Sequence, residues 1–303
     1  MDNIRKDLHL DRPKWQQFIL YLNDVSPVCI HSRDDIRKKQ LSGIFIGSNS
    51  TLGLKLPYLG RSYQTKRPVG AVLMEALPGT LILAFAAMIF ATIIGIGLGV
   101  LAALKKGTWV DSSAVFASIA GISAPSFFMA IIIAFFFGVV LNAYTGLNLT
   151  GSWFEVDEVT GDKYLSLKNL ILPAFTLGIR PLAIITQLTR SSMIDVLEQD
   201  YIRTAYAKGL PRRVIILKHA LRNALNPVIT AITGWFAELM AGAFFVEYVF
   251  GWKGIGKLTV DALEKLDYPV VMGSVLLSAT IFIIINLLAD TFYSVVDPRV
   301  SLG

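Results

Sequence analysis

The sequence predicts an all-α membrane protein, a polytopic helix bundle. Of its 303 residues, 54% are hydrophobic and the mean hydropathy is +0.58, whereas an average soluble chain is roughly 45 to 50% apolar. Five apolar stretches are long enough to cross a hydrocarbon core, which takes about 20 helical residues. They are residues 80–104, 114–141, 170–188, 228–250 and 270–293. A large soluble core is disfavoured, because ordinary core helices are shorter.

Residues 1–77 precede the first apolar stretch and are mixed in character. The segments IRKDLHL and KWQQFILYLNDV have the pattern of short amphipathic helices. The segment GIFIGSNSTLGLKLPYLGRSY is rich in glycine and serine, which favours loop with a hairpin. We therefore expect 1–77 to form a region of its own, followed by a transmembrane domain over 78–303.

Glycine and proline residues predict how the apolar helices pack and bend. Gly95 and Gly99 form a G-x-x-x-G pair in the first stretch, which lets a second helix approach closely. Packing is a better explanation for these glycines than a ligand. Pro125 and Pro173 fall within the second and third stretches, where a proline is expected to kink the helix.

The charges of the connecting loops predict one topology. Lys105 and Lys106 follow the first stretch, the loop before the third stretch is acidic, and the loop over 195–226 is basic. Because basic loops stay on the cytoplasmic side, we expect loop 195–226 and the C-terminus to face the cytoplasm. The net charge is +6, but no aromatic-rich RNA motif accompanies it, so nucleic-acid binding is disfavoured.

Within that loop, residues 198–227 predict a helix, a sharp turn and a second helix. The sequence is EQDYIRTAYAKGLPRRVIILKHALRNALNP, and its first half has helical periodicity. Gly209 stands where a left-handed helix end favours glycine. Pro211 stands near the start of a second helix, which we expect over about 212–225.

This loop resembles the signature cytoplasmic loop of ABC importer permeases. Arg203, Thr204 and Ala205 stand at its EAA positions and Gly209 at its glycine, while His219, Leu221 and Arg222 stand at its I-x-LP end. The wording DYIRTAYAKGL, HALRNALNPVIT and FFVEYVFGWKGIGKLTVDAL is similar to the dipeptide and oligopeptide branch. Arg222 in place of the family proline resembles the first of that branch's two permease subunits.

The resemblance implies a permease subunit of an ATP-driven, binding-protein-dependent importer in the cell inner membrane. Its implied substrates are di- or oligopeptides. The implied partners are a second related permease, two ATP-binding cassette ATPase subunits and an extracytoplasmic peptide-binding protein. The loop would be the coupling element that contacts the ATPases, and small residues there would allow close approach. The coupling candidates are Tyr201, Arg203, Thr204, Ala205, Lys208, Gly209 and Leu210.

Members of this family usually begin with a further transmembrane helix and an extracytoplasmic region. The predicted topology places residues 1–77 outside the cytoplasm, yet MDNIRKDLHLDRPKW has no apolar run typical of a signal peptide. We therefore expect this chain to lack the first of six family helices and to retain the end of the extracytoplasmic region. A five-span protein with an external N-terminus is the alternative.

The sequence carries no motif for catalysis. It contains no G-x-x-x-x-G-K-[ST], H-E-x-x-H or G-x-S-x-G pattern. Cys29 is its single cysteine, and the three histidines do not have metal-ligand spacing. We expect no enzyme activity, cofactor or metal in this chain, and we expect ATP hydrolysis in separate subunits.

Ionisable residues within apolar stretches are costly and point to function. Glu238 in WFAELMAGAFF is a candidate for the translocation path, since a peptide ammonium could bind it. Arg180 could line the path, snorkel or pair with Glu238, and structural roles are about as well supported as path roles. For Asp290 we favour a structural pairing with Arg299.

Two alternatives remain. The chain could belong to an importer for nickel or another small solute, or it could be a membrane scaffold that transports nothing. The genes beside it would separate these alternatives from a peptide importer.

Overall fold

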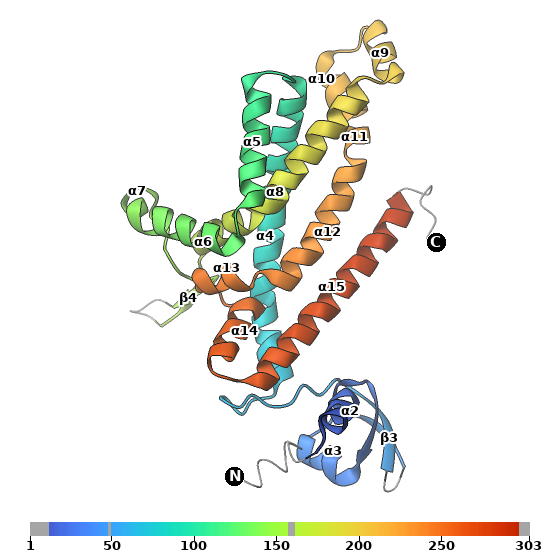
Figure 1. Cartoon of the computed structure of the whole chain (residues 1–303), viewed down its shortest axis with the longest axis vertical. Coiled ribbons are helices and arrows are strands. Elements are labelled where there is room, and N and C mark those ends of the chain that lie inside the picture. Colours follow the sequence, from blue (N-terminus) through green and yellow to red (C-terminus); the bar gives the residue numbers. More distant parts are fainter. Residues whose placement is uncertain (1–11, 48–49, 157–160, 297–303) are drawn as a thin grey trace. The chain divides into compact units, whose positions relative to one another are not determined.

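The computed structural model describes residues 12–47, 50–156 and 161–296 and shows a mostly helical chain (Figure 1). The chain divides into two compact units. The N-terminal unit comprises residues 1–75 and 262–273, and the helical unit comprises residues 76–261 and 274–303.

The N-terminal unit combines two helices with a small antiparallel sheet. Its elements are α2 (Lys14–Val25), β1 (Val28–Ser32), α3 (Arg33–Lys39), β2 (Gly43–Ile46) and β3 (Ser50–Lys55), with strand order β1-β3-β2. The predicted helix over KWQQFILYLNDV is α2, and the predicted hairpin is β2–β3. Strand β1 was not predicted, and IRKDLHL lies outside the described residues.

One face of this sheet carries exposed aliphatic side chains in two cross-strand rows. Each of these side chains is 58 to 76% exposed. The rows are Val28, Leu54 and Ile44, and Ile30, Leu52 and Ile46. On β1 the alternate residues Cys29 and His31 are buried. The sheet is therefore apolar on its exposed face, where an isolated soluble sheet is usually polar.

A buried carboxylate fixes two loops of the N-terminal unit. Asp267 is 3% exposed and accepts hydrogen bonds from the Ser62 hydroxyl and from the backbone N–H groups of Tyr63 and Gln64. Burial alone would raise the pKa of Asp267, but these hydrogen bonds hold its pKa below the usual value. The segment before α4 and the segment before α15 are thus held at one carboxyl group.

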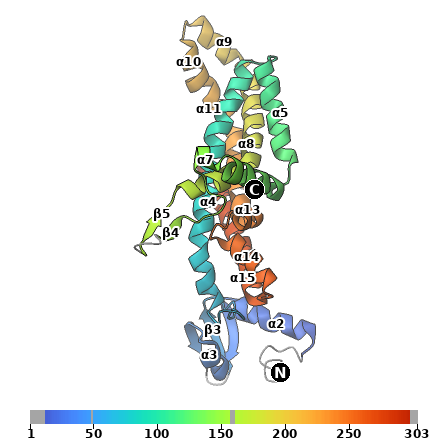
Figure 2. The same cartoon turned by 90° about the vertical axis from the view of Figure 1, so that its left-hand side faces the viewer.

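The helical unit consists of long helices joined by short helical and strand segments (Figures 1 and 2). Its elements are α4 (Val69–Leu104), α5 (Trp109–Ser123), α6 (Ser126–Phe135), η1 (Phe136–Val140), α7 (Asn142–Thr145), β4 (Phe154–Val156), β5 (Lys163–Leu165), α8 (Lys168–Leu197), α9 (Asp200–Ala207), α10 (Arg212–Val214), η2 (Ile215–Ala220), α11 (Leu221–Ala224), α12 (Asn226–Gly242), α13 (Phe244–Val249), α14 (Ile255–Glu264) and α15 (Tyr268–Val296). Figure 2 shows the β4–β5 ladder projecting from the helices.

The described residues contain three helices long and apolar enough to cross a membrane, namely α4, α8 and the first 22 residues of α15. A fourth span is obtained if α5 and the helix after Pro125 are counted together, although they are bent by 107°. Pro125 therefore breaks the second predicted stretch. At Pro173, in contrast, α8 continues without a break.

The fourth predicted stretch, 228–250, is not one helix. α12 ends at Gly242 and α13 begins at Phe244. The break has a physical reason, because α13 carries Glu247 into a buried position where hydrogen-bond donors meet its carboxylate. An apolar pattern alone does not reveal such a turn.

Glycines allow α4 and α8 to approach closely, as the G-x-x-x-G pair predicted. A Cβ at Gly95 would lie 2.9 Å from Ile185 Cγ2, and one at Gly99 would lie 2.7 Å from the Thr186 carbonyl oxygen. A Cβ at Gly97, on the same helix, would meet nothing within 4 Å. Gly95 and Gly99 therefore serve helix packing.

We expect Gly99→Ala to lower the stability of the folded chain by about 1 to 3 kcal/mol, because a close-packed interface does not take an added methyl group without shifts. Gly97→Ala is the matched control, and alanine favours helix over glycine by roughly 1 kcal/mol. Thermal unfolding of the detergent-purified protein measures both. Equal midpoints for the two variants would contradict this packing role.

Candidate functional site

α9 and the turn after it form a compact element at one end of the helical unit (Figure 1). Gly209 has φ +73°, so it takes the left-handed conformation predicted for the helix end. Its N–H donates to the Tyr206 carbonyl at 2.9 Å, and the N–H of Leu210 donates to the Ala205 carbonyl at 3.3 Å. These bonds close the end of α9 and reverse the chain toward α10.

α9 packs onto the helical unit through an apolar cluster. Ile202 is 1% and Ala205 6% exposed. Their buried neighbours come from α4, α8, η2 and α11, and are Ala103, Met193, Ile215, Ile216, Ala220 and Ala224. The sequence assigned Ala205 to the contact with an ATPase, whereas in this structure the Ala205 side chain is buried and faces inward. Its small size serves packing within the chain.

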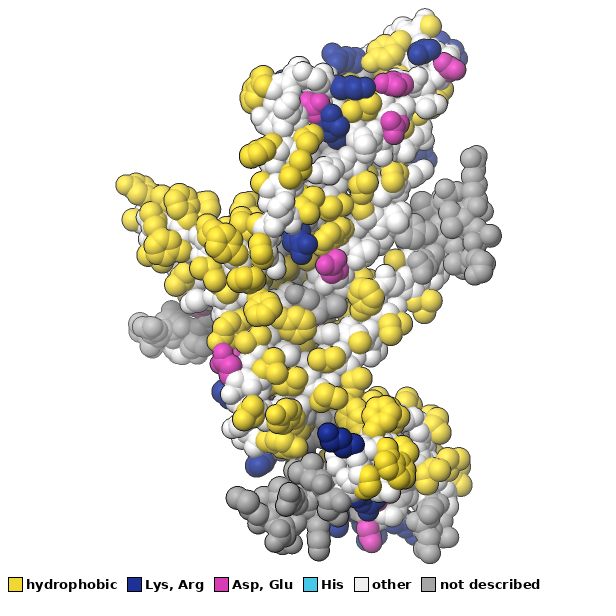
Figure 3. Space-filling model, viewed as in Figure 1, with side chains coloured by type: hydrophobic (Ala, Val, Ile, Leu, Met, Phe, Trp, Pro, Cys, Tyr) yellow, Lys and Arg dark blue, Asp and Glu magenta, His cyan; other side chains and the backbone are white. Residues whose placement is uncertain are grey.

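The other coupling candidates are exposed. Arg203, Thr204, Lys208 and Gly209 lie on the surface, and so do Tyr201, 43% exposed, and Leu210, 37% exposed. Figure 3 shows charged side chains gathered at this end of the helical unit. The element thus presents a mixed aromatic and basic surface, while Ile202 and Ala205 anchor it.

Polar contacts tie this end together. Asn223 Nδ2 donates to the Tyr201 hydroxyl at 2.9 Å, which joins α11 to α9. Arg190 on α8 forms a two-point ion pair with the carboxylate of Asp111 on α5, with Nη2 to Oδ2 at 2.8 Å. Asp111 also accepts from the Gly107 N–H at 3.0 Å. The ion pair therefore joins α5 to α8 through two charge-assisted hydrogen bonds, which fix the relative orientation of the two side chains.

The second helix of the loop contains a wide turn. The predicted helix over 212–225 is present as α10, η2 and α11, in which residues 215–220 form a π-helix. Pro211 stands immediately before α10, and its carbonyl accepts a hydrogen bond from the Val214 N–H at 2.9 Å. π-helical turns are rare and are often found at functional sites.

Arg180 on α8 and Glu238 on α12 do not form an ion pair with each other within the described residues. The guanidinium carbon of Arg180 instead lies 5.8 Å from the centre of the Trp235 ring. Arg180 is half-buried, and Glu238 is exposed. The expected partner of Asp290, Arg299, lies outside the described residues.

Sequence reasoning missed Glu247, which is fully buried at 0% exposure. Its Oε1 accepts from the Thr80 hydroxyl at 2.8 Å, and its Oε2 accepts from the Lys257 N–H at 3.1 Å. A Cβ at Gly254 would clash with its carboxylate. Trp252, fully buried beside it, donates from Nε1 to the Gly79 carbonyl at 2.8 Å. The closely spaced glycines in FGWKGIG were the sequence feature that could have indicated close packing around Glu247.

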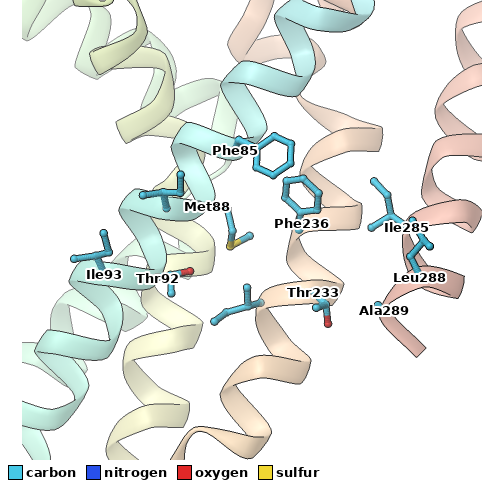
Figure 4. A pocket seen from close by; sticks show the side chains of 11 residues that line it. Phe85, Met88, Thr92, Ile93, Thr233, Phe236, Ile285, Leu288 and Ala289 are labelled. Atoms are coloured by element: carbon cyan, nitrogen blue, oxygen red, sulfur yellow. The ribbon is translucent and has the colours of Figure 1, made fainter. Parts of the chain in front are cut away.

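A groove of about 670 Å³ lies between α4, α12 and α15 (Figure 4). Apolar side chains line it, together with the Thr92 and Thr233 hydroxyl groups. Its other lining residues are Phe85, Met88, Ile89, Ile93, Ile232, Phe236, Ile285, Leu288 and Ala289. The groove suits a lipid chain or another apolar helix, but it offers no charged group for a polar solute.

Helices long and apolar enough to cross a membrane, with a charged helix–turn element at one end, are typical of an integral membrane protein. A family model described as the binding-protein-dependent transport system inner membrane component matches residues 95–302, and the chain belongs to this family. The chain is 44% identical over 254 residues to the dipeptide transport system permease protein DppB of Haemophilus influenzae, with 80% of this chain and 76% of the relative covered.

Two further relatives support the same branch. The chain is 38% identical over 314 residues to DppB of Escherichia coli K12, with 97% of this chain and 83% of the relative covered. It is 39% identical over 239 residues to the oligopeptide transport system permease protein AppB of Bacillus subtilis, with 77% of this chain and 72% of the relative covered.

The fold is also similar to a solved transporter. A chain of the MetNI methionine ABC transporter, in an inward-facing conformation, matches with a TM-score of 0.59 at 15% identity, covering 75% of this chain and 97% of that chain. At this identity the likeness shows the fold, which is that of an ABC transporter permease.

Proposed function

We propose that this chain is one permease subunit of an ATP-driven importer for di- or oligopeptides. The observation that carries the proposal is the match along most of the chain to DppB proteins, two of them at 38 and 44% identity. In the proposed assembly the chain pairs with a second related permease. Two ATPase subunits bind at the cytoplasmic side, and an extracytoplasmic binding protein delivers the peptide.

We propose that α9 is the coupling element and that it faces the cytoplasm. Closure of the ATPases would push on the exposed face formed by Tyr201, Arg203, Thr204, Lys208 and Leu210. Because Ile202 and Ala205 are buried against α8 and η2, that displacement would pass to the long helices. A loop without this apolar anchor would bend under the same force.

The test is transport by the purified complex in proteoliposomes. The full chain would be coexpressed with a second permease and with the ATPase subunits of a peptide importer, and the vesicles would enclose ATP. We expect a radiolabelled dipeptide to accumulate only when ATP and the loaded binding protein are both present, with ADP as the control. Accumulation of Ni²⁺ in place of peptide, or purification without any ATPase, would contradict the proposal.

A further inference from the structure

We propose that Arg180 and Glu238 form a recognition site for the two charged ends of a peptide in the translocation path. Arg180 would bind the carboxylate end and Glu238 the ammonium end, with Trp235 between them. This inference rests on the proposed function and assigns the substrate contacts of that path.

The Arg180 side chain has one unsatisfied hydrogen-bond donor. Its Nε is buried and has no hydrogen-bond partner within the described residues. The Trp235 ring, 5.8 Å from the guanidinium carbon, attracts the cation but accepts no ordinary hydrogen bond. A guanidinium in this state is suited to an incoming carboxylate, which it can bind through two parallel hydrogen bonds.

Glu238 lies on the same face of α12 as Trp235. The two residues are three apart, so they are neighbours on the helix surface. Since Arg180 sits over Trp235, the opposite charges of Arg180 and Glu238 share one side of the α8–α12 pair. Among the described residues neither side chain forms an ion pair, so no counter-ion from that part of the chain neutralises either charge.

The surroundings favour a water-filled path for this pair. Exposed charges are costly in hydrocarbon and face cavities or partner subunits in membrane proteins. In Figure 3 the middle of the helical unit is mainly hydrophobic or uncharged, interrupted by a small patch of each charge. The apolar groove lies elsewhere, because Ile232, Thr233 and Phe236 are roughly 120° or more around α12 from Glu238.

The two ends of a peptide can be tested separately. The assembled complex in proteoliposomes would be given three labelled dipeptides, one with both ends free, one N-acetylated and one C-amidated. The variants are Glu238→Gln and Arg180→Gln, with Glu238→Asp and Arg180→Lys as the conservative rescues. Uptake is normalised to the amount of assembled complex. Direct binding is measured on the same complex without the binding protein, whose own selectivity would otherwise enter.

We expect the wild-type complex to bind the free dipeptide about tenfold more tightly than either blocked form, as for loss of one charged hydrogen-bonding partner. Glu238→Gln should remove the discrimination against the acetylated peptide alone, and Arg180→Gln that against the amidated peptide alone. Equal loss for all three peptides, or wild-type binding that ignores both blocks, would overturn the inference while peptide transport itself remained. Loss of complex yield with unchanged ratios would also overturn it, and would leave the two residues as structural.

Discussion

Gly209→Val is expected to reduce peptide uptake by roughly tenfold or more while the permease still binds its ATPases. Gly209 is left-handed at φ +73°, and a Cβ there would meet nothing within 4 Å. The obstacle is therefore the backbone conformation itself, which costs an L-residue roughly 1–2 kcal/mol and suits β-branched residues least. The turn would relax by changing the angle between α9 and α10, and the exposed face of α9 would move with it.

Two variants make this test specific. Gly161 has φ +74° and is equally open, so Gly161→Val introduces the same strain in a loop far from α9 in the sequence, and should leave uptake near normal. Gly209→Asn should retain most activity, because asparagine tolerates the left-handed conformation. ATPase pull-down, ATP hydrolysis and uptake are measured on each variant. Normal uptake by Gly209→Val would show that this turn does not couple the two activities.

Glu247→Ala is expected to lower the stability of the folded chain by about 3 kcal/mol. The change would leave the buried Thr80 hydroxyl and the part-buried Lys257 N–H without this acceptor, at a cost of about 1–3 kcal/mol, and it would open a cavity beside Trp252. Glu247→Gln keeps the side-chain shape, but its amide NH₂ would face either the Thr80 hydroxyl or the Lys257 N–H, which are themselves donors. We therefore expect a stability between those of the wild type and Glu247→Ala. Thermal unfolding and the yield of assembled complex measure both effects.

The matched control is Glu198→Gln. Glu198 is exposed and meets Lys106 in a surface ion pair at 3.2 Å, and such pairs contribute about 0–1 kcal/mol. A stability loss of the same size in Glu198→Gln and Glu247→Gln would mean that burial of the carboxylate is not what matters at position 247.

Periodicity and turn residues predicted the elements whose cause is local. Gly209 took the conformation that the end of α9 requires, α2 formed over KWQQFILYLNDV, and Gly95 and Gly99 met α8. The first two outcomes depend on a few consecutive residues, and the third on the four-residue spacing of small residues along α4. The resemblance in the loop wording placed the chain in its family before any helix packing was known.

Features that the sequence did not predict arose where distant residues decide the outcome. Ala205 reads as a small surface residue, but its burial depends on Met193 and Ile215 from other helices. The apolar run over 228–250 reads as one span, but the partners that draw Glu247 inward are Thr80 and Lys257. The exposed aliphatic face of the β1-β3-β2 sheet depends on how its strands are aligned, and the composition of residues 1–77 does not reveal that alignment.

The burial of Cys29 makes this chain convenient for thiol chemistry. Cys29 is the single cysteine of the sequence and is 2% exposed. Its Sγ lies 3.6 Å from the Gly53 carbonyl oxygen. A bulky maleimide should therefore spare the unaltered folded protein. A cysteine introduced at Thr204 would be the accessible thiol for cross-linking a neighbouring subunit, and one at Ala205 would report an interior position. Contacts of α9 can thus be mapped without first removing a native thiol.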